Sequence, residues 1–267
     1  MLDRRSFEKH LANLKPGGRL RVPHDCGPGR TLLISHVDDG VMAHCFRCND
    51  SAFIKDERSL AERIAALAKA RAADVDVVRP ELPEPRERDV QQWPKAARVW
   101  LYKAGLSNDA IERLGFYWHP VTQRVVLPVF ENGELVYWQA RSLNPNVPKY
   151  INPTVERGTI APRFGRGGDC IVLTEDILSA VKVGMVNEAW SIMGTSLPDK
   201  IAVRLVNAAR PVIVMLDPDD AGRKGTAKII TQLRLLGLTA GSYLGRADPK
   251  RLSIKEIECA LTSTSLS

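Results

Sequence analysis

The stretch Val212-Ile-Val-Met-Leu-Asp217-Pro-Asp219-Asp220-Ala-Gly222-Arg223-Lys224-Gly225 joins an apolar run of strand length to grouped carboxylates, a glycine and two cations. Carboxylates grouped where a buried strand ends repel each other and are costly to desolvate, unless a metal ion or a charged ligand lies among them. Asp217 and Asp219 are two positions apart, so on an extended backbone they project to the same side. This geometry favours Mg²⁺ held by one or two carboxylates. The alternative is a solvated loop in which Asp219 or Asp220 caps the next helix.

Strands and helices alternate on both sides of this stretch. Apolar, β-branched segments predict strands at 170–174, 189–193, 211–216 and 238–244, and the segments between and after them predict helices at 176–186, from Pro198, at 221–236 and at 253–261. Such alternation is typical of a parallel sheet with helices on both faces, and its ligands bind beyond the carboxyl ends of the strands. Acidic residues follow three of these strands, namely Glu175, Asp217 with Asp219, and Asp248. We expect them to converge at one edge of the sheet.

The composition is that of a globular protein with a basic balance. The chain has 267 residues and a formal net charge of +7, which favours a polyanionic partner. It has no apolar run of membrane-spanning length and no signal peptide, so we expect a cytosolic protein with reduced thiols. The phosphate loop G-x-x-x-x-G-K-[ST] is absent from the sequence, so an NTP-driven motor is not expected.

The N-terminal zone differs in composition from the rest of the chain. Its first 55 residues hold three of the five cysteines and four of the five histidines. Residues 59–71 form an alanine-rich amphipathic pattern that predicts a short helix. Residues 79–88 are proline-rich and charged, which predicts an extended tether that packs into no core. From about residue 91 the pattern is globular.

Two close-spaced pairs in the N-terminal zone predict a structural zinc site. Cys45-Phe-Arg-Cys48 has the C-x-x-C spacing with which one tight turn supplies two zinc ligands, and His24-Asp-Cys26 is the best second pair. Strands at 31–35 and 40–43 between the pairs complete the pattern of a zinc ribbon. Zinc would drive folding here, because so short a zone has few large apolar side chains.

Alternatives to this zinc site remain open from the sequence. His36 or His44 could replace His24 as the histidine ligand. A redox C-x-x-C is disfavoured, since it is expected at the start of a helix in a βαβ unit. Cys170 and Cys259 are isolated and are predicted to be buried, small apolar residues.

The acidic and basic motifs together carry a family resemblance. Thr174-Glu175, the segment Asp217-Pro-Asp219-Asp220-Ala-Gly-Arg-Lys and Asp248-Pro-Lys250 resemble the acidic signature of the TOPRIM fold, shared by bacterial-type primases, type IA and type II topoisomerases and some nucleases. Gln139-Ala-Arg141-Ser-Leu and Pro148-Lys149-Tyr150-Ile-Asn-Pro153 resemble the basic subdomain of bacterial and phage primases. With the ribbon in front, the chain resembles a stand-alone bacteriophage DNA primase of the bacterial, DnaG-like type. It departs from the family where Asp176 replaces a common glycine and Ser179 replaces a usual acidic residue.

This resemblance implies a multidomain α/β architecture. It consists of a zinc-binding ribbon of small β type at residues 1–55, a helix and proline-rich tether at 56–90, a mixed α+β basic subdomain at 91–168 and a TOPRIM α/β parallel sheet at 169–267.

The resemblance also implies a function. A primase is a DNA-directed RNA polymerase, a nucleotidyltransferase that makes short RNA primers from ribonucleoside triphosphates on single-stranded DNA. Here it would serve phage DNA replication in the cytoplasm of the infected bacterial host, with a separate replicative helicase and DNA polymerase as partners and no membrane. The alternatives are a TOPRIM nuclease, which would use the same carboxylates with water as nucleophile, and a non-catalytic, zinc-dependent single-stranded DNA-binding protein.

Roles for individual residues follow from the same resemblance. Glu175, Asp217 and Asp219 are the expected catalytic residues, and with Asp248 they would bind Mg²⁺ or Mn²⁺. Asp220 is expected to cap the following helix. Contacts to nucleotide and DNA are expected from Arg141, Lys149, Arg223, Lys224 and Lys250, and the ribbon's candidates for reading the template are His36, Asp38, Phe46 and Arg47.

Overall fold

The computed structural model describes residues 2–3, 5–14, 18–37, 40–58, 62, 80–155 and 157–266. The chain divides into two compact units, one made of residues 1–74 with 156–159 and 198–200, the other of residues 75–155, 160–197 and 201–267. The helix predicted at 59–71 lies outside the described residues, apart from Glu62.

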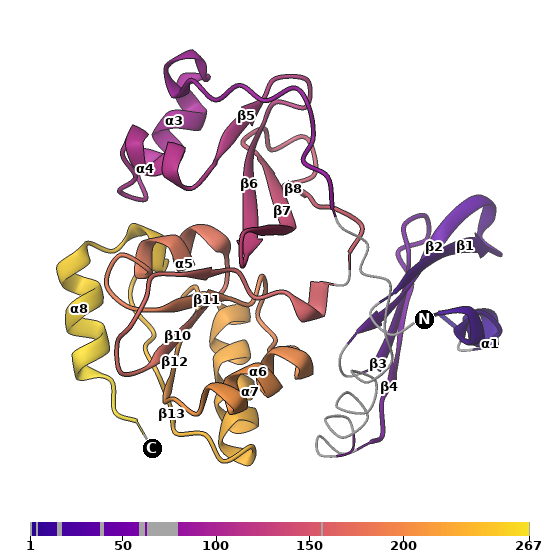
Figure 1. Ribbon diagram of the computed structural model, residues 1–267. Coiled ribbons are helices and arrows are strands. Elements are labelled where there is room, and N and C mark those ends of the chain that lie inside the picture. The colour runs from indigo at the N-terminus through magenta and orange to yellow at the C-terminus, as the bar shows by residue number, and fades with distance from the viewer. Residues whose placement is uncertain are drawn as a thin grey trace. The chain divides into compact units, whose positions relative to one another are not determined.

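The first unit contains a four-stranded antiparallel sheet (Figure 1). Its strands pair in chain order and are β1 (Arg19–His24), β2 (Gly27–Val37), β3 (Gly40–Cys45) and β4 (Ser51–Lys55). Two short helices precede it, α1 (Arg5–Glu8) and the 3₁₀ turn η1 (Leu11–Asn13). The predicted hairpin is confirmed as the centre of this sheet, and two outer strands extend it.

The ribbon has a small apolar core that the sequence pattern did not predict. Phe7, Leu32 and Ile34 are fully buried, together with Cys45. Phe7 comes from α1, so a residue outside the sheet is part of this core. Among the residues that the structure describes, the cluster holds seven buried ones, and a bound metal would add to its limited stabilisation.

The prediction of a free tether at residues 79–88 is wrong for the part that the structure describes, residues 80–88. Glu87 bridges to Trp118 in antiparallel fashion, and the Trp138 indole donates a hydrogen bond to the Glu81 carbonyl at 2.8 Å. The Tyr117 hydroxyl donates to the Pro83 carbonyl at 2.9 Å. Proline-rich chain cannot form its own hydrogen-bonded structure, but its free carbonyls accept hydrogen bonds from a neighbouring sheet. This segment is therefore part of the second unit.

The second unit begins with a helical segment and an antiparallel sheet. The helical elements are η2 (Val90–Gln92), α3 (Lys95–Tyr102) and α4 (Asn108–Arg113). The sheet has the order β5–β6–β7–β8, with β5 (Tyr117–His119), β6 (Arg124–Glu131), β7 (Glu134–Ser142) and β8 (Tyr150–Ile151). A short η3 (Arg157–Thr159) follows β8 in the chain.

The predicted parallel sheet is confirmed. Its order is β13–β12–β10–β11–β9, with all pairs parallel except the edge pair of β11 and β9. The strands are β9 (Arg163–Phe164), β10 (Ile171–Thr174), β11 (Ala189–Ser191), β12 (Val212–Met215) and β13 (Ala240–Ser242). The helices are α5 (Ile177–Val183), α6 (Asp199–Ala208), α7 (Asp220–Leu235), η4 (Pro249–Arg251) and α8 (Ile254–Ser263).

Helices cover both faces of this sheet (Figure 1). Ile171 and Leu173 pack with residues of α6 and α7, whereas Val172 between them packs with residues of α5 and α8. This period of two is the reason that the central strands are apolar throughout. Ile177 and Leu178 of α5 also belong to the core that includes β6 and β7, so the two sheets of this unit share a helix.

Candidate functional site

Five carboxylates gather at one edge of the parallel sheet, and we call them the acidic rim: Glu175, Asp176, Asp217, Asp219 and Asp248. Glu175 follows β10 directly, Asp217 follows β12, and Asp248 lies between β13 and η4. These three strands are neighbours and parallel, so their carboxyl ends lie at the same edge. The predicted convergence of acidic residues is therefore confirmed.

Lys250 lies among the carboxylates of the rim. Its Nζ is 2.7 Å from Asp176 Oδ2, 3.0 Å from Asp248 Oδ2 and 3.2 Å from Asp217 Oδ2. Burial opposes the charged form, but the charges of Asp176 and Asp217 outweigh it and raise the pKa of Lys250. An ammonium has three donors, and here all three have carboxylate acceptors. The hydrogen-bonding capacity of Lys250 is thus already used within the rim, and its predicted contact with nucleotide or DNA stays a prediction.

Glu175 and Asp217 each have an oxygen that lacks a partner. Glu175 Oε2 and Asp217 Oδ1 are buried and make no hydrogen bond. Burial, followed by the nearby charges of Asp217 and Asp219, raises the pKa of Glu175. Burial also raises the pKa of Asp217, although Lys250 opposes the shift. Buried carboxylate oxygens without partners are costly, and a divalent cation satisfies such oxygens.

The structure corrects the assignment of the helix cap. Asp219, not Asp220, is the N-cap of α7, because Asp219 Oδ1 accepts a hydrogen bond from the Gly222 backbone N–H at 2.8 Å. Asp220 lies in the first turn with its side chain 86% exposed and pairs with Arg223. At Gly222 a Cβ would lie 1.9 Å from the Asp217 carbonyl oxygen, so only glycine lets the helix start this close to the strand end.

The two predicted cations on α7 are exposed, whereas Lys250 is largely buried among carboxylates. Arg223 pairs with the exposed Asp220 and donates to the Pro218 carbonyl. Lys224 is exposed on the next position. Both are near the rim in sequence and remain predicted contacts to nucleotide or DNA.

The basic segment of β7 and β8 lies next to the acidic rim. Arg141 of β7 and Tyr150 of β8 are directly opposite each other in the sheet. The guanidinium carbon of Arg141 is 5.1 Å from the Tyr150 ring centroid and 5.7 Å from the Trp100 ring centroid. Burial raises the pKa of Tyr150, and the charge of Asp176 adds to this, while Arg141 and Lys250 oppose it. Groups of both the basic segment and the rim therefore act on the Tyr150 hydroxyl. Lys149 is exposed beside it, with Nζ 5.4 Å from the same ring.

Arg124 orders this basic segment and was not singled out from the sequence. Its side chain is buried, and its guanidinium donates to the carbonyls of Pro148 at 2.7 Å, Ala140 at 3.2 Å and Lys149 at 3.3 Å. Burial lowers the pKa of Arg124. Through its hydrogen bonds it ties the backbone of Pro148 and Lys149 to β7. No local motif marks such a residue, whereas Asp176 stood beside Glu175 and could have been found as a further rim carboxylate.

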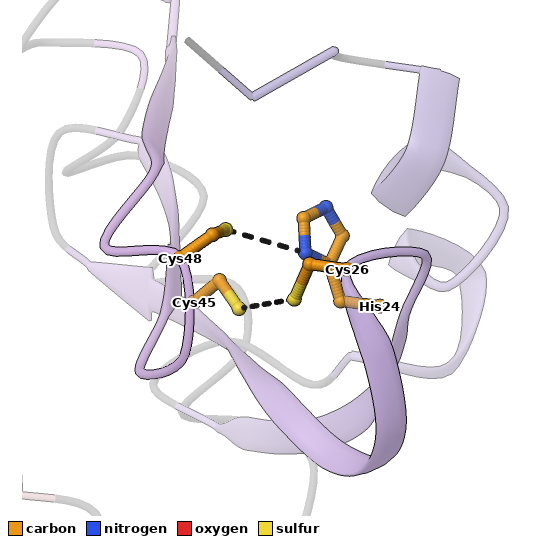
Figure 2. Close-up of side chains that lie close together, drawn as sticks. All are labelled: His24, Cys26, Cys45 and Cys48. Carbon is orange, nitrogen blue, oxygen red and sulfur yellow. Dashed lines mark hydrogen bonds between the residues drawn. The ribbon is translucent and has the colours of Figure 1, made fainter.

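The first unit holds a compact set of metal ligands, shown in Figure 2. Ligand atoms of His24, Cys26, Cys45 and Cys48 all lie within 4.8 Å of one another. Cys26 Sγ is 3.4 Å from Cys45 Sγ, and His24 Nδ1 is 3.6 Å from Cys48 Sγ. A tetrahedral zinc with bonds of about 2.0–2.3 Å separates its ligand atoms by roughly 3.3–3.8 Å. The four residues therefore fit zinc.

The sheet places these ligands on two turns. His24 and Cys26 lie at the β1–β2 connection, and Cys45 and Cys48 lie at the β3–β4 connection. His44 is not among the clustered ligand residues, and its Nδ1 is hydrogen-bonded to Ser51 Oγ at 2.9 Å.

Hydrogen bonds prepare Cys45 for metal binding. Burial raises the pKa of its thiol, but hydrogen bonds with Thr31 and the Cys48 and Arg47 backbones outweigh this and lower it to about 5. A thiolate is the form that binds zinc.

One face of the ribbon exposes large side chains. Phe46 is 58% exposed and Phe53 is 50% exposed. The Arg21 guanidinium carbon lies 5.1 Å from the Phe46 ring centroid, and the His44 ring meets Phe46 edge-on. His36 is opposite Val41, which packs against the core, so His36 lies on that same face and not on the face that carries Phe53. Asp38 lies outside the described residues.

Within the described part of the chain, no helix has the length and apolar character needed to cross a membrane.

Comparison with known proteins finds similarity to a Toprim-like family model and to a DNA primase. Residues 174–246 match the family model described as Toprim-like. A DNA primase of Halalkalibacterium halodurans is 31% identical over 144 residues, which are 48% of this chain and 24% of that protein. The chain thus matches about a quarter of the length of this curated relative.

Solved structures share the fold. The zinc-binding and RNA polymerase domains of the Aquifex aeolicus primase give a TM-score of 0.53 at 17% identity, over 98% of this chain and 84% of that chain. A DnaG primase catalytic domain bound to single-stranded DNA gives 0.53 at 20% identity, over 68% of this chain and 75% of that chain. The resemblance to bacterial-type primases, with a zinc ribbon and a TOPRIM domain, is confirmed, and a phage origin stays a prediction.

Proposed function

We propose that this chain, which has a Toprim-like region and the fold of the zinc-binding and RNA polymerase domains of bacterial primases, is a DNA primase that makes short RNA primers on single-stranded DNA. The observation that carries the proposal is the pair of buried, unpartnered oxygens, Glu175 Oε2 and Asp217 Oδ1, at the carboxyl ends of adjacent parallel strands. Such oxygens fit a divalent cation that also binds phosphate.

Glu175, Asp217 and Asp219 would hold Mg²⁺ or Mn²⁺. When bound, the ion would lower the pKa of the attacking 3′-hydroxyl and neutralise charge on the phosphates. Asp248 would act differently from the expectation, because its carboxylate is paired with Lys250. Glu175, with its raised pKa, is suited either to join the metal ligands or to accept the hydroxyl proton.

The basic segment would position the reacting phosphates. Arg141 and Lys149 are the proposed contacts to nucleotide and template, and Arg124 and Tyr150 hold them beside the acidic rim. In phosphoryl transfer, positioning and electrostatic stabilisation provide most of the catalysis. Arg223 and Lys224 would add contacts at the edge of the site.

The ribbon would bind zinc through His24, Cys26, Cys45 and Cys48 and would recognise the template. Single-stranded bases stack on exposed aromatic rings, and Phe46 with Arg21 beside it offers such a surface. Sequence-dependent priming is therefore assigned to this face.

The biological setting is part of the same proposal. Priming of phage DNA replication in the bacterial cytoplasm, next to a separate helicase and DNA polymerase, is the setting suggested by the resemblance of the sequence motifs to those of bacterial and phage primases.

A priming assay tests the proposal. The protein is incubated with single-stranded DNA, labelled ribonucleotides and Mg²⁺, and oligoribonucleotides are expected. Asp217→Asn should abolish synthesis and leave DNA binding nearly intact, whereas Asp109→Asn, which changes an exposed carboxylate on α4, should retain synthesis. Strand cleavage without synthesis would favour the nuclease, and DNA binding with neither product would favour the non-catalytic binder.

A further inference from the structure

Lys250 occupies the kind of position that a metal ion takes in an acidic site. Its Nζ contacts carboxylate oxygens from three separate parts of the fold: Asp176 at the start of α5, Asp217 after β12 and Asp248 before η4. The Lys250 side chain is only 19% exposed, so the three contacts are shielded from solvent.

The two oxygens of Asp217 face different environments. Its Oδ2 is 3.2 Å from Lys250 Nζ, whereas its Oδ1 is buried and has no hydrogen-bond partner. Glu175 Oε2 is likewise buried and unpartnered, and Asp217 and Asp219 are the charges that act most strongly on Glu175. On one side of the rim the carboxylate oxygens contact the Lys250 ammonium. On the other side Glu175 Oε2 and Asp217 Oδ1 have no hydrogen-bond partner.

The charges on the rim give this division a consequence. Lys250 contributes one positive charge against five carboxylates, so the free side still attracts a cation. Sites that bind two divalent ions place them about 3.5–4 Å apart, each shared by a bridging carboxylate. In this rim Asp217 is the residue in the bridging position: its Oδ2 contacts Lys250, and its Oδ1 is unpartnered.

Resting on the proposed function, we propose that Lys250 is a built-in counter-ion that takes the place of a second divalent cation, so that the rim binds one divalent ion, at Glu175, Asp217 and Asp219. Lys250 is a positioning residue: it holds Asp217 with Oδ1 directed away from the ammonium. It also pairs with one oxygen of Asp248 and one of Asp176, whose other oxygen accepts a hydrogen bond from the Ser179 backbone N–H.

Counting bound Mn²⁺ tests this directly. The full chain, with its ribbon saturated with Zn²⁺, is titrated with Mn²⁺, and free Mn²⁺ is followed by its electron paramagnetic resonance signal. The wild type should bind one tight Mn²⁺, and Glu175→Gln should lose it. Lys250→Met should bind a second Mn²⁺ or bind the first at least about tenfold more tightly, because a buried positive charge is removed from beside it.

Arg251→Met is the matched control. Arg251 is the neighbouring cation, 3.9 Å from Asp248, but its side chain is 73% exposed, so solvent screens it. Its loss should change Mn²⁺ affinity by less than about threefold.

Three outcomes would overturn the inference: two tight Mn²⁺ ions in the wild type, unchanged or weaker binding in folded Lys250→Met, or an equal effect in Arg251→Met. The number of Mn²⁺ ions bound by the wild type tests the inference even if Lys250→Met does not fold. Primer synthesis is assayed separately, so two Mn²⁺ ions with normal priming would reject the role of Lys250 alone. One Mn²⁺ ion without priming would reject the proposed function instead.

Discussion

Substitutions of Asp219 can separate its two roles, as the cap of α7 and as a carboxylate of the acidic rim. Its Oδ1 accepts a hydrogen bond from the Gly222 N–H at 2.8 Å. Asparagine and serine can accept the same bond, but alanine cannot. All three replacements remove the negative charge. Asp219→Asn, Asp219→Ser and Asp219→Ala therefore share the loss of charge and differ in the cap.

The expected stabilities follow from these contacts. Asp219→Ala loses the cap, which is worth about 1 kcal/mol, and a favourable charge at the helix N-terminus, which is worth about 0.3–1 kcal/mol. The variant should thus be destabilised by about 1–2 kcal/mol. Asp219→Asn and Asp219→Ser lose only the charge, and relief of repulsion with Glu175 offsets this loss. They should stay within about 0.5 kcal/mol of the wild type.

Synthesis should respond to the charge and not to the cap. All three variants should lose primer synthesis by at least about a hundredfold, which corresponds to about 2.7 kcal/mol of transition-state stabilisation. Stability is measured by urea denaturation with tryptophan fluorescence, because all five tryptophans lie between Trp93 and Trp190, in the second unit. Synthesis is measured by incorporation of labelled ribonucleotide.

Asp220→Asn is the control for this series. Asp220 is highly exposed and its ion pair with Arg223 is on the surface, so stability should change by less than about 0.5 kcal/mol and synthesis should be retained. Wild-type synthesis by Asp219→Asn would refute the reasoning and reduce Asp219 to a helix cap. Loss of synthesis in Asp220→Asn would show that the two neighbouring aspartates were assigned the wrong way round.

Three further predictions concern zinc, stability and the basic segment. Cys45→Ser should release zinc, measured by elemental analysis, because it removes the buried ligand of the set. Burial raises the pKa of Glu188, but hydrogen bonds from Trp190 and Arg210 outweigh this effect and lower the pKa. Its stabilising contribution is therefore present above the unfolded pKa of about 4.3 and is lost as pH falls through the lower folded pKa. Glu188→Gln should cost about 1–2 kcal/mol at pH 7, and the difference from wild type should shrink below about pH 4 in urea denaturation. Tyr150→Phe should lower kcat/KM for priming by about tenfold with little change in stability, since it removes the hydroxyl that interacts with Arg141.

Each of these three predictions can be contradicted by a specific result. Cys259 was predicted to be buried, but in the structure it is exposed and lies outside the ribbon. Cys259→Ser should keep its zinc, and equal zinc in Cys45→Ser would reject the ligand set. A pH-independent deficit in Glu188→Gln would mean that packing, not the ionised carboxylate, is what Glu188 contributes. Full activity in Tyr150→Phe would leave the ring, and not the hydroxyl, as the useful part of Tyr150.

Much of the fold was predictable because its signals are local. The alternation of apolar strands and amphipathic helices from residue 169 onward depends on periodicity along the chain, and the structure has every strand and helix that it predicted. The C-x-x-C of Cys45 and Cys48 is likewise a short-range signal, since one turn brings both thiols together. Glu175 and Asp217 were identifiable because a carboxylate directly after a parallel strand lies at the ligand-binding edge.

Other features were decided by contacts between distant segments. His24 was chosen over His44 by the pairing of β1 with β2 and of β3 with β4, which no spacing encodes. The proline-rich residues 80–88 looked like a tether, but the exposed edge of β5 and the donors of Tyr117 and Trp138 bind them.

The sequence alone therefore determined the strand–helix order and the Cys45–Cys48 ligand pair, because each depends on neighbours a few residues apart. It also indicated the edge at which acidic residues meet, because carboxylates directly follow the predicted parallel strands. Only the tertiary structure decided how the charges at that edge are shared. Lys250 is 74 positions from Asp176 and 33 from Asp217, yet its ammonium contacts both. Coulombic and hydrogen-bond energies depend on distance in space, and folding is what converts separation along the chain into contacts of about 3 Å.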